Sequence, residues 1–164
     1  MEGKIMATGK EFCGHLVPAV QWSGQDELFL QPVYIVPLEI FTTGLLARPE
    51  YKTVMAIVEA VGGRVSIVAA KNVPKIAGGE PKGRKLPVNV ALDRAVSSAE
   101  SAGVSEGREG WRALAGSSHV MARESEARAC WKVWIRSGGS LVDTVTGKSF
   151  PVGELLGLLL PQEE

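Results

Sequence analysis

The sequence predicts an α/β domain with a four-stranded, mainly parallel central sheet and helices on both of its faces. Two observations favour this fold class. From residue 38 onward, β-prone runs alternate with segments whose apolar residues have helical spacing, and glycines and prolines stand between them. The chain has 164 residues and is 45% apolar, which is enough for one domain with its own core. We therefore expect a single domain over residues 15–164, preceded by a flexible lead over residues 1–14.

An N-terminal hairpin is predicted over residues 15–36. Its two β-prone runs flank the polar sequence at residues 23–27, which has the composition of a turn. Pro37 lacks the N–H group that a strand interior needs, so the first central strand is expected to begin at Leu38.

The first helix is predicted over residues 49–61, and a strand follows over residues 64–70. Pro49 suits the first helical turn, and Gly62 suits the position just beyond the helix end. The apolar residues between them have helical spacing: Tyr51, Val54, Met55, Val58 and Val61.

Residues 71–116 are predicted to form one long insertion, because structureless loops of this length are unusual in compact domains. Residues 71–85 carry five Lys and Arg side chains against a single Glu, which predicts a basic loop. Its glycines do not precede the Lys-Ser/Thr pair of a phosphate-binding loop, so we expect no nucleotide site there. A short amphipathic helix is expected over residues 88–102.

The remaining predicted elements are a strand over residues 118–122, a second helix over 126–136, a fourth strand over 141–145 and a closing helix over 151–160. The second helix has the strongest apolar pattern in the chain, at positions i, i+3, i+4, i+7 and i+8. These positions hold Ala127, Cys130, Trp131, Trp134 and Ile135.

Charge and residue types exclude several function classes. Lys plus Arg and Asp plus Glu each total 18, so the formal net charge is zero, unlike that of a protein that coats nucleic acid. The two cysteines and two histidines lack metal-ligand spacing, and no apolar run is long enough to cross a membrane. Ser118 and His119 are adjacent on a predicted strand and face opposite ways, so they form no nucleophile–base pair. We expect no catalytic residues, metal, cofactor or enzymatic activity.

One group of residues points to a bound phosphate. Thr42-Thr43-Gly44 lies where a strand passes into a helix, the edge at which parallel α/β sheets bind ligands. Arg128, Lys132 and Arg136 recur every four residues and form a basic stripe on the second predicted helix. A hydroxyl, a glycine N–H and a cation are suitable contacts for a phosphate group, and a sulfate or phosphate ion could occupy the site. The alternative is a plain turn beside a solvated basic stripe.

The order and spacing of these segments resemble a BRCT domain. Residues 38–44 (LEIFTTG) are similar to the family's first strand, which ends in Ser/Thr-Gly, and residues 58–65 (VEAVGGRV) to its passage from a helix into the second strand. Residues 118–121 (SHVM) look like its third strand, and the second helix and fourth strand resemble their counterparts. The extra hairpin and the closing leucine-rich helix are similar to the C-terminal BRCT domain of a kinetoplastid kinetochore protein.

The resemblance implies a non-enzymatic protein-interaction module that binds a phosphoserine or phosphothreonine peptide of a partner. The family's hydroxyl falls on Thr43, its backbone amide on Gly44 and its lysine closest to Lys132, with Arg128 or Arg136 able to share that role. It also implies a nuclear, chromosome-associated assembly such as a kinetochore, a cell-cycle checkpoint or the DNA damage response. Two alternatives stay open: a BRCT domain that holds DNA by a 5′ phosphate, and a scaffold that binds protein without phosphate.

Overall fold

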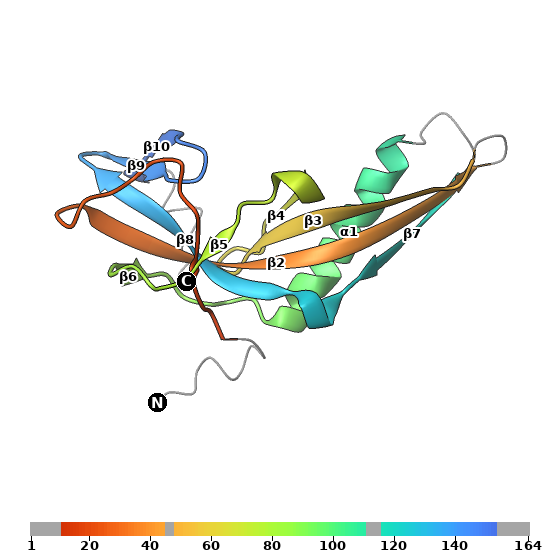
Figure 1. The fold of residues 1–164 in the computed structure, drawn as a ribbon, viewed down its shortest axis with the longest axis horizontal. Helices are drawn as coiled ribbons and strands as arrows, with labels where there is room; N and C mark the ends of the chain where they lie inside the picture. Colours follow the sequence, from red (N-terminus) through yellow and green to blue (C-terminus); the bar gives the residue numbers. More distant parts are fainter. Residues whose placement is uncertain (1–10, 45–47, 111–115, 154–164) are drawn as a thin grey trace.

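The computed structural model describes residues 11–44, 48–110 and 116–153, and their strands form one ten-stranded sheet. The main strands follow the order β10-β9-β8-β2-β3-β4, and β7 pairs with the second half of β2 (Figure 1). The longer elements are β2 (Glu27–Gly44), β3 (Glu50–Glu59), β4 (Val65–Ala69), α1 (Leu92–Gly110), β7 (Gly116–Ala122), β8 (Arg128–Ser137) and β9 (Ser140–Asp143). The short ones are β1 (His15–Leu16), η2 (Ala70–Asn72), β5 (Ile76–Ala77), β6 (Arg84–Lys85), η3 (Glu124–Glu126) and β10 (Ser149–Pro151).

This architecture is not the α/β fold that the sequence predicts. The described residues contain one α-helix, α1, which packs against β2, β7, β4 and β3. The long strands pair antiparallel, since β2 runs opposite to β3, β7 and β8. The predicted parallel sheet with helices on both faces is therefore wrong, and so is the BRCT-like fold.

The strand β2 organises the whole sheet. It extends over 18 residues and pairs along one side with β3, and along the other side first with β8 and then with β7. Pro37 does not end the strand, because it lies at the break between these two partners: pairing with β8 stops at Ile35 and pairing with β7 starts at Leu38. The Pro37 carbonyl accepts the Arg123 N–H at 2.9 Å. Beyond the break, β2, β3 and β7 extend as an arm (Figure 1).

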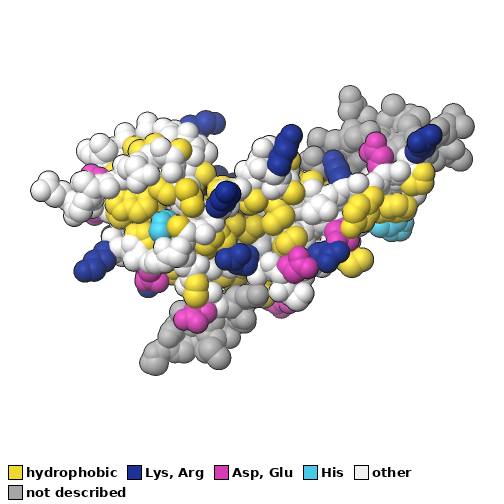
Figure 2. Space-filling model, viewed as in Figure 1, with side chains coloured by type: hydrophobic (Ala, Val, Ile, Leu, Met, Phe, Trp, Pro, Cys, Tyr) yellow, Lys and Arg dark blue, Asp and Glu magenta, His cyan; other side chains and the backbone are white. Residues whose placement is uncertain are grey.

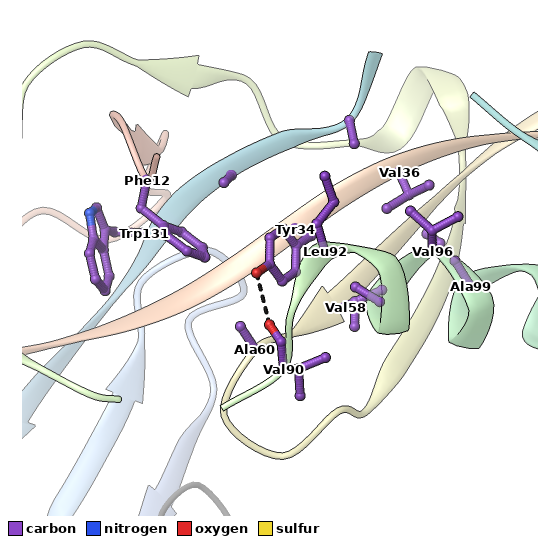
Figure 3. Packing of buried hydrophobic residues seen from close by; sticks show 14 of the residues in the cluster. Phe12, Tyr34, Val36, Val58, Ala60, Val90, Leu92, Val96, Ala99 and Trp131 are labelled. Atoms are coloured by element: carbon purple, nitrogen blue, oxygen red, sulfur yellow. Dashed lines mark hydrogen bonds between the residues drawn. The ribbon is translucent and has the colours of Figure 1, made fainter. Parts of the chain in front are cut away.

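The N-terminal residues pair differently from the predicted hairpin. The strand β1 is only two residues long and pairs with β5 and β8 rather than with β2. Phe12 is buried, and its ring centroid lies 5.2 Å from that of Tyr34 and 5.4 Å from that of Trp131 (Figure 3). The chain therefore joins the core from residue 12, within the segment expected to be a flexible lead.

Two of the predicted helices, over residues 49–61 and 126–136, are strands in the structure, β3 and β8. In β3 the buried side chains of Val54, Ala56 and Val58 alternate with less buried ones, the period of a strand. The members of β8 that face the main core also alternate: Ala129, Trp131, Val133 and Ile135. The strands predicted over residues 64–70, 118–122 and 141–145 are confirmed as β4, β7 and β9, whereas most of the predicted closing helix lies outside the described residues.

The main core lies between the sheet and α1, so the predicted insertion is part of the domain rather than an appendage. The helix begins at Leu92, within the stretch expected to be helical, and buries one apolar side against the sheet (Figure 3). A Cβ on Gly103 would lie 2.9 Å from Val120, so glycine allows the helix to approach β7 closely. Just before the helix, the Val90 carbonyl accepts the Tyr34 hydroxyl at 2.8 Å.

Candidate functional site

A groove of about 300 Å³ opens on the face of the sheet opposite α1. Alternation along β2 defines this face, because Tyr34 and Val36 belong to the core that contains α1, whereas Val33 and Ile35 belong to a separate cluster. In the view of Figure 1, β2 and β3 pass in front of α1, and Figure 2 shows hydrophobic side chains gathered over the middle of the same view.

The walls of the groove are mainly apolar. In the separate cluster that contains Val33 and Ile35, Leu16 of β1 and Val145, which follows β9, pack against residues of β2 and β3. This covering turns half of the sheet face into a recess. Its apolar lining residues are Leu16, Val33, Ile57, Val68, Pro74 and Val145.

An ion pair lies at the polar end of the groove. Lys132, which lines the groove, places its Nζ 2.7 Å from Asp143 Oδ2, and the two side chains are only 19% and 7% exposed. The other carboxylate oxygen of Asp143 accepts the backbone N–H groups of Val145 at 2.8 Å and Thr146 at 3.2 Å. The turn after β9 therefore fixes the carboxylate, and the carboxylate in turn orients the ammonium group.

The side chains of Gln31 and Trp134 lie beside the Lys132–Asp143 ion pair, on the same face of the sheet. The Trp134 Nε1–H donates to Gln31 Oε1 at 2.9 Å, and Lys132 Nζ lies 4.8 Å from the Trp134 ring centroid. Gln31 is fully buried, and its Nε2 has no hydrogen-bond partner of normal geometry within the part of the chain that the structure describes. A buried donor in this state costs free energy, and the Glu59 carboxylate, whose pKa the Gln31 side chain lowers, is the acceptor beside it.

Glu59 is the second charged group that lines the groove. Burial raises the pKa of its carboxyl, and the nearby Asp143 carboxylate acts in the same direction. Arg64, Lys132 and Gln31 oppose this shift, with Arg64 Nε 3.9 Å from Glu59 Oε1. Glu59 is thus a half-buried acid whose ionised form is under-stabilised, and such groups are concentrated at functional sites.

The residues predicted to bind phosphate do not come together. Thr42 is buried, and Thr43 and Gly44 lie at the end of the arm, where β2 pairs with Ser117 and Gly116 of β7. Lys132 pairs with Gln31, 12 positions back along β2 from Thr43, a separation of about 40 Å at about 3.3 Å per residue.

The predicted basic stripe lies on a strand instead of a helix. Arg128, Lys132 and Arg136 are all in β8, where they pair with Ile35, Gln31 and Glu27. Residues four apart on a strand face the same side but lie about 13 Å from each other. Arg128 and Arg136 therefore lie one on each side of Lys132 along the strand, and the structure does not bring the basic stripe together with Thr43 and Gly44.

Sequence reasoning missed Glu59, Gln31 and Asp143 as parts of one site. The available signal was a polar residue within an apolar segment, such as Gln31 in β2 or Glu59 in β3. Because residues 49–61 were expected to be a helix, this signal did not place Glu59 beside Gln31. The partners of Lys132 come from three other strands, so only the strand register reveals them.

A second, shallower recess of about 150 Å³ lies on the arm. Phe41, Tyr51 and Met121 expose 38%, 59% and 63% of their surface there. A hydrogen bond from Tyr51 and the Arg123 guanidinium lower the pKa of the neighbouring Glu39 carboxyl, and Arg123 forms an ion pair with this group.

No protein-family model, curated protein or solved structure matches this chain. Among the described residues, no helix is long and apolar enough to span a membrane. The same part of the chain contains no cluster of three or more His, Cys, Asp or Glu side chains suited to a metal ion.

Proposed function

We propose that this chain is a non-enzymatic binding module that takes up a small amphipathic organic molecule in the groove over β2 and β3. The observation that carries the proposal is the combination, in one recess, of apolar walls with half-buried Glu59 and Lys132. Ligand sites are typically largely apolar clefts of about 300–1,000 Å³ with a few convergent polar groups, and this groove is at the small end of that range.

The lining favours binding over catalysis. No His or Cys is among the described residues of the groove, and its hydroxyl groups, on Ser66 and Thr146, therefore have no imidazole base beside them. The Lys132 side chain is directed at the Asp143 carboxylate, 2.7 Å away, which is an arrangement for an ion pair rather than for a nucleophile.

The earlier expectations of phosphopeptide and DNA-end binding depended on a phosphate site that the geometry separates, so they do not enter this proposal. The expected nuclear location depended on the same family resemblance. What we retain from the sequence is a non-enzymatic binding role.

The test is a fragment screen by thermal shift and ligand-observed NMR, with Ser66→Trp as the variant that fills the groove. Ser66 lines the groove and is exposed, so the added indole blocks the recess without disturbing the core. Ser97→Trp, on the exposed side of α1, is the matched control. A ligand at about ten times its Kd adds about 1.4 kcal/mol, or about 3–6 °C in Tm for a chain of this size.

We expect fragments that stabilise the wild type and the Ser97→Trp variant to have no effect on the Ser66→Trp variant. Equal shifts in all three proteins, or no binding fragment at all, would contradict the proposal.

A further inference from the structure

The charges at the polar end of the groove come from the two strands that flank β2. Glu59 of β3 pairs with Val33, and Lys132 of β8 pairs with Gln31, two positions away on the same face. With strands about 4.8 Å apart and about 3.3 Å per residue, the two Cα atoms are separated by about 12 Å. Both side chains line one groove, so an acid and a cation face the same ligand from opposite sides.

These charges have no net excess. Glu59 and Asp143 are balanced by Lys132 and Arg64, the four charged groups that interact at this location. An anionic ligand would be attracted by Lys132 and repelled by Glu59, and a cationic ligand would meet the reverse. An uncharged hydrocarbon would displace water from both charged groups and offer neither of them a hydrogen bond, which costs free energy.

We propose, building on the proposed function, that the ligand is a free α-amino acid with an apolar side chain. Its α-ammonium group donates to the Glu59 carboxylate and its α-carboxylate accepts from the Lys132 ammonium, which has N–H donors beyond the one directed at Asp143. Its side chain packs against the wall formed by Val33, Ile57 and Val68.

The size of the groove agrees with such a ligand. At about 30 Å³ per water molecule, 300 Å³ holds about ten waters, which is more than enough room for a leucine molecule. Burial raises the pKa of Glu59 more than Arg64, Lys132 and Gln31 lower it, so the ionised form lacks counter-charge that a ligand ammonium group would supply.

The experiment compares three probes by isothermal titration calorimetry: L-leucine, 4-methylpentanoate, which lacks the ammonium group, and 3-methylbutylamine, which lacks the carboxylate. We expect each analogue to bind at least about tenfold more weakly than leucine, since a charge-assisted hydrogen bond contributes about that factor or more. In Glu59→Gln, leucine and 4-methylpentanoate should bind equally. In Lys132→Met, leucine and 3-methylbutylamine should bind equally, while Arg136→Met should match the wild type.

The outcomes separate this inference from the proposed function. If the three probes bind the wild type equally, or one analogue binds more tightly than leucine, the amino acid assignment is overturned and the groove remains a site for another amphipathic molecule. If none of the three probes binds, while other fragments bind the wild type and not the Ser66→Trp variant, the amino acid assignment is again overturned. If nothing binds in the groove, both proposals fail. The comparison of probes on the wild type alone decides the matter if Lys132→Met folds poorly.

Discussion

The strongest prediction for stability concerns the ion pair between Lys132 and Asp143. In Lys132→Met the alkyl stem is kept and the ammonium is lost, so the Asp143 carboxylate, 7% exposed, loses its cation. Removing one partner of a fully buried pair costs about 3–5 kcal/mol. Because Lys132 is 19% exposed and two backbone N–H groups continue to bond Asp143, we expect a smaller effect than for a fully buried pair, about 2–3 kcal/mol.

The measurement is urea unfolding followed by circular dichroism, where the midpoint should fall with an unchanged slope. The corresponding fall in Tm is about 5–10 °C for a chain of this length. Arg136→Met is the matched control, since Arg136 lies on the same strand and face but is exposed, and it should change stability by less than about 0.5 kcal/mol. The double variant Lys132→Met/Asp143→Asn should recover about 1–2 kcal/mol relative to the sum of the single changes. Equal stability of Lys132→Met and Arg136→Met would refute the reasoning.

Three further outcomes follow from individual side chains. Burial raises the pKa of the Cys130 thiol to about 12, whereas Cys13 is exposed. Ellman's reagent at pH 8 should therefore titrate one thiol in the folded chain and two in denaturant. Rapid reaction of two thiols in the folded chain would contradict the burial of Cys130. Tyr34→Phe should destabilise the fold by about 1–2 kcal/mol in urea unfolding, because the Val90 carbonyl loses its buried donor; a neutral effect would mean that another group satisfies this carbonyl. Burial raises the pKa of Glu59 above its usual 4.5, so the folded state holds this proton more tightly than the unfolded state. The free energy of unfolding therefore falls as pH rises from about 4.5 through the folded pKa. Urea midpoints measured from pH 4 to 8 should show this fall in the wild type and not in Glu59→Gln. Identical pH profiles of the midpoint in the two proteins would show that Glu59 titrates normally.

The sequence predicts the positions of secondary-structure elements along the chain better than it predicts whether each one is a helix or a strand. The strands β4, β7 and β9 and the start of α1 agree with local patterns, because their lengths and composition favour one element. The segment that forms β3 was predicted as a helix because Val54 and Val58 are four residues apart. That spacing is even as well as helical, so it fits both periods, and Ala56 between them fits only the strand.

The same ambiguity affects β8. Trp131 and Trp134 are three residues apart, which suggests one face of a helix, but they lie on opposite faces of the strand, in two separate clusters. Both faces are covered here, so both tryptophans are buried and the alternation of polar and apolar residues disappears. A strand that is buried on both faces has a nearly continuous apolar sequence, which periodicity alone cannot distinguish from a buried helix.

The location of the site is a consequence of how β2 is covered. Val33 and Ile35 face the same way as Glu39 and Phe41, and the sequence of β2 does not distinguish the two pairs. The difference comes from distant residues: Leu16 and Val145 cover the first half and create a recess, while Phe41 on the arm remains 38% exposed. A charged pair introduced under that cover is shielded from water, whereas the ion pair of Arg123 and Glu39 on the arm is accessible to it. The role in binding proposed for Lys132 therefore depends on its cover and its neighbours, and a basic residue at the same spacing without them, such as Arg136, is expected to have none.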